Sequence, residues 1–123
     1  MVSNNLSKWF LVLLTGFVFT ACATLPKAEM EGAASWYGRQ HQGQKTASGE
    51  KFDMHALTAA HRTFPFGTRV RVTSLTTQKE VIVRINDRGP YARDRIIDLS
   101  YEAARRIGMI GRGFDQVKLE RLP

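Results

Sequence analysis

The chain has 123 residues, 43% of them hydrophobic and 24% charged, and this ordinary globular composition excludes an intrinsically disordered chain. Its length leaves room for one compact domain with a single hydrophobic core. The formal net charge is +7, so we expect an acidic partner: nucleic acid, anionic lipid headgroups or the carboxylates of a cell wall.

The first 21 residues have the organisation of an export signal. Lys8 precedes an apolar run at 9–18, which is as long as the hydrophobic part of a signal peptide and too short to span a bilayer as a helix. The following sequence, FTAC at 19–22, resembles the processing site of bacterial lipoproteins, in which the cysteine is acylated and becomes the N-terminus. We therefore expect residues 1–21 to be a lipoprotein signal peptide and Cys22 to carry the lipid. The alternative is an ordinary secretory signal beside an incidental cysteine.

Cys22 is the only cysteine, so no disulfide can form within the chain, and a lipid-modified thiol needs none. Ala23 follows it, and in lipoproteins of this class a residue other than aspartate favours delivery to the outer membrane. We therefore expect a lipid-anchored protein of the cell envelope, on the periplasmic face of the outer membrane. Export argues against nucleic acid as the partner, which leaves lipid headgroups and the wall.

A change in pattern separates a linker from the domain. Pro26 and the lack of periodicity identify residues 22–31 as the lipidated cysteine and a short linker, and residues 32–122 are expected to form the domain. Within the domain, residues 38–51 form a polar stretch without periodicity. So long a stretch in so small a domain predicts a binding loop.

Short runs of β-branched residues predict six strands. Val70 and Val72 alternate with polar neighbours, which indicates a strand with one buried and one wet face. The strands are expected at residues 33–37, 57–60, 68–73, 80–85, 95–99 and 114–122. Ser100 can cap one helix at 101–107. Because closure removes exposed strand edges, we expect an all-β barrel with one short helix, although periodicity does not give its connectivity.

Three polar clusters at strand ends or in loops are candidates for a functional site. They are residues 46–50, residues 59–62, and residues 86–90 with Asp98 beyond them. Each also has a structural interpretation. Asp87 lies in a strong turn sequence and could accept backbone N–H bonds, while Asp98 could satisfy buried donors. His61 could be an ordinary hydrogen-bonded strand end, and Glu50 a solvated charge.

Other kinds of chemistry have less support. The spacings of His41, His55 and His61 match no helical zinc motif, so no metal site is expected, and the sequence gives no sign of a cofactor. Cys22 lies outside the domain, and no serine lies in a nucleophile-elbow sequence. A cysteine or serine nucleophile is therefore not expected.

Six ordered motifs resemble those of the rare lipoprotein A family and span nearly all of residues 32–121. They are ASWYG at 34–38, TASGE at 46–50, LTAAH at 57–61, PFGT at 65–68, VRINDRGP at 83–90 and RIIDLS at 95–100. The resemblance implies a six-stranded double-psi β-barrel, related to the barrels of expansins and of the membrane-bound lytic transglycosylase A class.

The resemblance also implies an activity, the non-hydrolytic cleavage of peptidoglycan glycan strands between N-acetylmuramic acid and N-acetylglucosamine. The product carries a 1,6-anhydro end, and glycan without stem peptides is the preferred substrate. The catalytic acid falls on Asp87, with His61 and Glu50 as the other catalytic residues. The residues assigned to substrate binding are Tyr37, Ser48, Arg88 and Arg93. Glycan strands are thus the expected partner, and cell-division proteins are further candidates.

One catalytic acid is enough for this chemistry. A glycosidase needs a second carboxylate as a nucleophile or to activate water, whereas here the sugar's own 6-hydroxyl attacks within the molecule. One residue can protonate the leaving oxygen and later accept the hydroxyl proton. The alternative interpretation is a non-catalytic envelope lipoprotein that binds peptidoglycan, because Glu50, His61 and Asp87 could serve binding as well.

Overall fold

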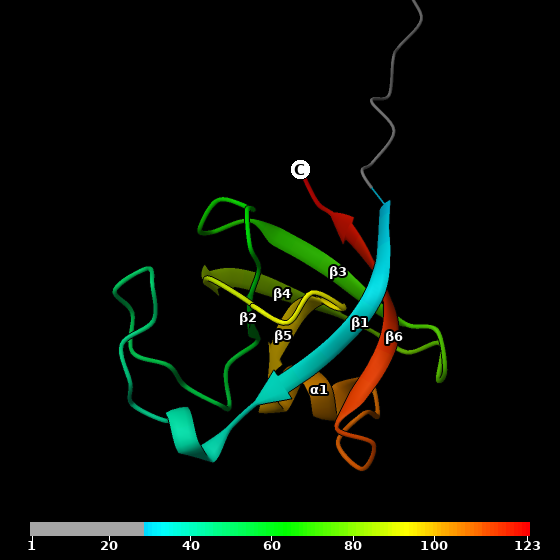
Figure 1. The fold of residues 1–123 in the computed structure, drawn as a ribbon, viewed down its shortest axis with the longest axis horizontal. Helices are drawn as coiled ribbons and strands as arrows, with labels where there is room; N and C mark the ends of the chain where they lie inside the picture. The colour runs from blue at the N-terminus through cyan, green and yellow to red at the C-terminus, as the bar shows by residue number, and fades with distance from the viewer. Residues whose placement is uncertain (1–28) are drawn as a thin grey trace, which may run out of the picture.

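The computed structural model describes residues 29–123, so the expected signal peptide and Cys22 lie outside the described residues. Within residues 29–123, six strands form a closed barrel, and one α-helix packs beside it (Figure 1). The elements are β1 (Glu29–Tyr37), the 3₁₀ helix η1 (Arg39–His41), β2 (Thr58–Ala60), β3 (Arg69–Ser74), β4 (Glu80–Asp87), β5 (Arg95–Ser100), α1 (Tyr101–Arg106) and β6 (Phe114–Arg121). The prediction of an all-β, six-stranded barrel with one short helix is confirmed.

The strands follow one another around the barrel in the order β1-β5-β2-β4-β3-β6, and β6 pairs with β1 to close it. Two neighbouring pairs are parallel, β1 with β5 and β2 with β4, while the other four are antiparallel. Parallel neighbours need a crossover connection. The crossovers place strands from distant parts of the sequence side by side, which is what assembles the site described below.

Alternation along the strands fills the barrel with branched aliphatic side chains. The buried apolar residues of three consecutive barrel strands are Val81, Val83 and Ile85 of β4, Val70 and Val72 of β3, and Val117 and Leu119 of β6. Their neighbours in sequence are mostly exposed or half-buried, as expected for strands with one wet face. The core therefore occupies the barrel interior.

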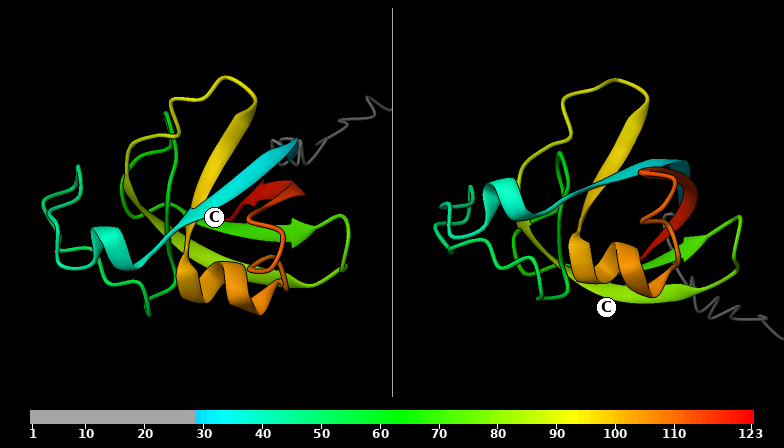
Figure 2. Two further views of the ribbon diagram at one scale, coloured as in Figure 1. Left: turned by 60° about the horizontal axis from the view of Figure 1, so that its bottom comes forward. Right: turned by 90° about the horizontal axis from the view of Figure 1, so that it is seen from below.

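Helix α1 covers one end of the barrel, and the loop between β4 and β5 rises on the opposite side (Figure 2). Ser100 caps α1 as expected, because its Oγ accepts a hydrogen bond from the N–H of Ala103 at 3.2 Å. The helix ends at Arg106, one residue before the expected end, and Gly108 follows with a φ of +79°. None of the helices within residues 29–123 has the length and apolar character needed to cross a membrane.

Two segments are more regular than the sequence indicated. Strand β1 begins at Glu29, so residues 29–31, expected to be linker, belong to the barrel, where they pair with β6. The polar stretch at 38–51 begins with η1 and then folds back on itself, as the N–H of Gly43 donates to the carbonyl of Phe52 at 2.9 Å. Phe52 is buried at the base of this small loop and holds it against the barrel.

Candidate active site

Two aspartates lie near one another where β4, β2, β5 and β1 run side by side. Ala60 of β2 pairs with Asp87 at the end of β4 and with Asp98 of β5. Asp98 pairs in turn with Ser35 of β1, and the Ser35 hydroxyl donates a hydrogen bond to Oδ1 of Asp98. Two carboxyl groups that are 11 positions apart in sequence thus flank a single short strand.

Tyr37, near the end of β1, directs its phenol into the same region. Burial raises the pKa of Tyr37, and the nearby negative charges of Asp87 and Asp98 raise it further. The phenol therefore keeps its proton. Its oxygen is buried and has no hydrogen-bond partner within residues 29–123, so the hydroxyl is an unsatisfied donor beside the two aspartates.

The carboxyl group of Asp87 is held through one of its two oxygens. Oδ1 accepts hydrogen bonds from the N–H of Ala47 and from the N–H of Arg88, each at 2.9 Å. Within residues 29–123, no hydrogen bond reaches Oδ2, since both donors to this carboxyl group bond to Oδ1. Oδ2 is therefore the oxygen through which Asp87 can exchange a proton with a ligand.

Glu50 is bound to the barrel by a two-point ion pair. Arg84 donates to Oε1 at 2.5 Å and to Oε2 at 2.9 Å, and the side-chain amide of Asn86 donates to Oε2 at 3.4 Å. The hydrogen bonds from Arg84 lower the pKa of Glu50 below its usual value, so Glu50 is a carboxylate at neutral pH. The ion pair also directs the Arg84 guanidinium to Glu50.

Ser48 lies in the same loop and fixes it onto the end of β4. Its N–H donates to the carbonyl of Asn86 at 3.2 Å, and its hydroxyl lies 2.9 Å from that of Thr46. Because Ala47 contacts Asp87 and Glu50 contacts Arg84, the whole loop at 46–50 docks on β4.

His61 follows β2, and its ring is turned into its own loop. The N–H groups of Thr63 and Phe64 donate to Nδ1 at 3.1 and 3.0 Å, and the ring stacks on Phe64 with the centroids 3.8 Å apart. Burial, together with the positive charges of Arg88 and Arg62, lowers the pKa of His61 to about 4. The ring is therefore neutral at pH 7, with its proton on Nε2, since Nδ1 is an acceptor. Its contact with Asp87 runs through the backbone, from the N–H of His61 to the Asp87 carbonyl at 3.2 Å.

The two arginines expected to bind substrate differ in their surroundings. The Arg88 guanidinium lies 4.0 Å from the centroid of the Phe66 ring, and its Nη1 donates to the carbonyls of Phe64 at 2.8 Å and His61 at 3.3 Å. Arg88 therefore stabilises the loop after β2. Arg93 is exposed in the loop between β4 and β5, where the described part of the chain offers its side chain no partner.

The loop between β4 and β5 is itself fastened by Arg62. The guanidinium of Arg62 donates to the carbonyls of Pro90 at 2.7 Å, of Ala92, and of Arg95 at 2.7 Å. Three backbone acceptors on one side chain hold the loop beside His61. This contact was not foreseen, because nothing in the sequence links Arg62 to a loop about 30 residues later.

The structure thus brings together most of the residues that the sequence singled out, around the end of β4. These are Tyr37, Ser48, Glu50, His61, Asp87 and Arg88, whereas Arg93 lies farther along the loop and Cys22 lies outside the described residues. The sequence did not single out Ser35 by itself, and it left Asp98 as a candidate with a structural alternative; the hydrogen bond from Ser35 to Asp98 comes from the pairing of β1 with β5. In residues 29–123, no group of three His, Asp or Glu side chains is placed to hold a metal ion.

Solved structures with the same fold include the expansin of Clavibacter michiganensis. The two structures superpose with a TM-score of 0.63 at 21% sequence identity, over 77% of this chain and 50% of the expansin chain. At this identity the similarity concerns the fold alone, and it agrees with the expected relation to expansin barrels.

Two relatives are much closer in sequence. The chain is 54% identical over 102 residues to the "Probable endolytic peptidoglycan transglycosylase RlpA" of Synechocystis, which covers 83% of this chain and 32% of that protein. It is 53% identical over 91 residues to the "Endolytic peptidoglycan transglycosylase RlpA" of Pseudomonas aeruginosa, covering 74% of this chain and 27% of that protein. The chain thus spans about a third or less of the length of these relatives.

The family comparison covers the whole barrel. Residues 29–119 match the double-psi β-barrel family described as lytic transglycolase, and this match begins at the first residue of β1 and ends within β6. The similarity is therefore one of the complete domain rather than of isolated motifs. The chain belongs to the lytic transglycolase family of double-psi β-barrels.

Proposed function

We propose that this protein is a lytic transglycosylase that cuts peptidoglycan glycan strands between N-acetylmuramic acid and N-acetylglucosamine. The observation that carries the proposal is the grouping of Asp87, Asp98 and the protonated phenol of Tyr37. Within residues 29–123, Oδ2 of Asp87 accepts no hydrogen bond. Family membership and the names of the two relatives support it. Glycan without stem peptides is the substrate that we expect it to prefer.

The proposed reaction needs one carboxyl group that gives and takes a proton. Asp87 donates a proton from Oδ2 to the bridging oxygen, and the bond between C1 of the muramic acid and that oxygen breaks, which releases the N-acetylglucosamine end with a 4-hydroxyl. The muramic acid's own 6-hydroxyl attacks C1, the C1–O6 bond forms, and the hydroxyl proton passes to Asp87. The acid is thereby regenerated, and no water is consumed.

The neighbouring groups have complementary roles in this proposal. The carboxylate of Asp98 stabilises the positive charge that develops at C1, in the manner of a preorganised electrostatic partner. The Tyr37 hydroxyl donates a hydrogen bond to a sugar oxygen, since its own partner is lacking. Glu50 and His61 hold the loops that frame Asp87, and Ser48, Arg88 and Arg93 contribute to substrate binding.

The test is to incubate the protein with amidase-treated peptidoglycan and to search for 1,6-anhydromuramic acid ends by mass spectrometry. We expect products from the wild type and a loss of at least about a hundredfold in rate for Asp87→Asn, as for the removal of a general acid. Asp94→Asn is the matched control, because Asp94 is an exposed aspartate of the neighbouring loop. If the wild type binds glycan without producing anhydro ends, the non-catalytic binding protein is the better interpretation.

We further propose that Cys22 carries the lipid that anchors the domain to the periplasmic face of the outer membrane. The support is the export-type sequence at 1–21 and the single cysteine of the chain. Two or more acyl chains on one residue are enough for stable anchoring. Labelled palmitate should enter the wild type but not Cys22→Ala. Equal labelling of both proteins would refute the anchor. Cell-division proteins can then be sought as partners of the lipid-anchored protein.

A further inference from the structure

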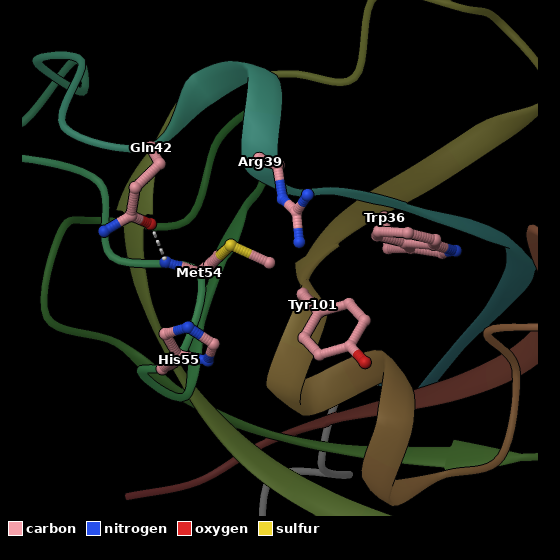
Figure 3. Close-up of a pocket in the computed structure, with 6 residues that line it drawn as sticks. All are labelled: Trp36, Arg39, Gln42, Met54, His55 and Tyr101. Carbon is pink, nitrogen blue, oxygen red and sulfur yellow. Dashed lines mark hydrogen bonds between the residues drawn. The ribbon is translucent and has the colours of Figure 1, made fainter.

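A hollow lies where β1 ends close to the start of α1. It has a volume of about 580 Å³ and is lined by Trp36, Arg39, Gln42, Met54, His55 and Tyr101 (Figure 3). This volume lies within the range of sites that hold small organic ligands, roughly 300 to 1,000 Å³. None of these six residues has a role in the reaction proposed above.

The walls of this hollow, called the Trp36 pocket below, are aromatic and fixed. The rings of Trp36 and Tyr101 meet edge to face with their centroids 5.5 Å apart, and the ring of His55 stands at 87° to that of Tyr101. The N–H of Met54 donates to the side-chain oxygen of Gln42 at 2.7 Å, and the Met54 carbonyl accepts from the N–H of Glu102 at 3.0 Å. The loop over the pocket is thus tied to α1.

Arg39 supplies the charge of the Trp36 pocket. Figure 3 shows its guanidinium pointing into the space between Met54, Trp36 and Tyr101. Unlike the guanidinium groups of Arg62, Arg84 and Arg88, the Arg39 guanidinium makes no hydrogen bond or ion pair with another residue of the described part of the chain. An unpaired guanidinium beside aromatic rings favours a ligand that has both a carboxylate and an apolar face.

The Trp36 pocket adjoins the surroundings of Tyr37 at the end of β1. A smaller hollow of about 310 Å³ shares Trp36 and Arg39 with the pocket and also includes Tyr37. Trp36 and Tyr37 are consecutive in the strand, so their side chains face opposite sides. Gly38 follows them without a side chain, and an added Cβ there would lie only 2.9 Å from the Trp36 ring. The two hollows thus adjoin one another at the end of β1.

We propose that the Trp36 pocket is a second carbohydrate site, which binds a muramic acid residue of the same glycan strand through its lactyl carboxylate. This inference rests on the proposed function for the identity of the strand. The apolar face of the pyranose ring packs on Trp36 and Tyr101, while Arg39 pairs with the carboxylate. The net charge of +7 agrees with an acidic ligand.

The experiment uses the full chain with Trp9→Phe, which leaves Trp36 as its only tryptophan. Fluorescence of Trp36 is measured during titration with N-acetylmuramic acid, with its methyl ester, and with acetyl-D-alanyl-D-alanine. We expect saturable binding of the free acid and about tenfold weaker binding of the ester and of Arg39→Gln, since one charge-assisted hydrogen bond is lost. Arg69→Gln, an exposed arginine of β3 outside the pocket, should bind like the parent.

Three results would overturn this second site: no response to the free acid, an equal response to the ester, or equal binding by Arg39→Gln. An equal response to the dipeptide would assign the pocket to stem peptides and overturn it too. The test is separable from the proposed activity, because Asp87→Asn should bind the sugar acid normally. If the wild type forms anhydro products but does not bind the sugar acid, only the second site is refuted. If it binds the sugar acid but forms no anhydro products, only the proposed activity is refuted.

Discussion

The buried, neutral imidazole of His61 should make the barrel lose stability in mild acid. His61 is only 3% exposed, and its pKa falls from 6.5 to about 4 in the folded protein. As the pH drops below 6.5, the unfolded chain takes up a proton at this position, whereas the folded chain does not until about pH 4. The loss of stability is therefore nearly absent at pH 7. It grows as the pH falls from 6.5 to about 4 and is constant at lower pH.

The size of the effect follows from the two pKa values. Relative to pH 7, the free energy of unfolding should fall by about 2 kcal/mol at pH 5 and by about 3 kcal/mol at pH 4 from His61 alone. The matched variant is His61→Asn, whose side-chain oxygen can accept the N–H bonds of Thr63 and Phe64 but does not titrate. The carboxylates that titrate in this range are common to both proteins and cancel in the difference.

Urea unfolding followed by circular dichroism at pH 7, 6 and 5 measures the two stabilities. His61→Asn should be the less stable protein at pH 7, because it loses the ring stack on Phe64, but its stability should depend less on pH. The gap between the proteins should narrow by about 2 kcal/mol at pH 5. Stabilities that change in parallel, within about 0.5 kcal/mol, would refute the assignment of a buried neutral imidazole.

Three further substitutions test other parts of the structure. Ser100→Ala removes the cap on Ala103 and should lower the free energy of unfolding by about 1 to 2 kcal/mol in urea, while Ser100→Thr should retain most of it. Asp115→Ala removes the buried carboxylate that accepts hydrogen bonds from Ser74, Thr76 and Arg112, which should cost about 1 to 3 kcal/mol in the same assay. Gly38→Ala should displace the Trp36 ring and alter the near-UV circular dichroism; an unchanged spectrum would contradict the close contact.

Strands β3 and β4 were the easiest part of the fold to predict. Val70 and Val72 alternate with polar residues, β4 follows after a short turn, and both strands lie within one or two residues of their expected bounds. The start of β1 was missed because residues 29–31 carry no strand pattern of their own. Their strand conformation comes from pairing with β6, which is nearly 90 residues away in sequence.

The site was predictable in its parts but not in its arrangement. The three polar clusters do adjoin one another, since Ser48 bonds to Asn86 and His61 bonds to Asp87 through the backbone. The approach of Tyr37 to Asp98 depends on the parallel pairing of β1 with β5, and periodicity cannot reveal such a crossover. The chemical roles of these residues stay predictions until the variants are measured.

The placement of β6 sets the order in which the barrel can be completed. β6 is the last strand in sequence, yet it lies between β1 and β3 and completes the barrel. Until residues 114–121 are available, β1 and β3 each lack a partner along one edge, and the strand that carries Ser35 and Tyr37 is held only by β5. The strand that carries Ser35 and Tyr37 is therefore paired along both edges only when β6 closes the barrel.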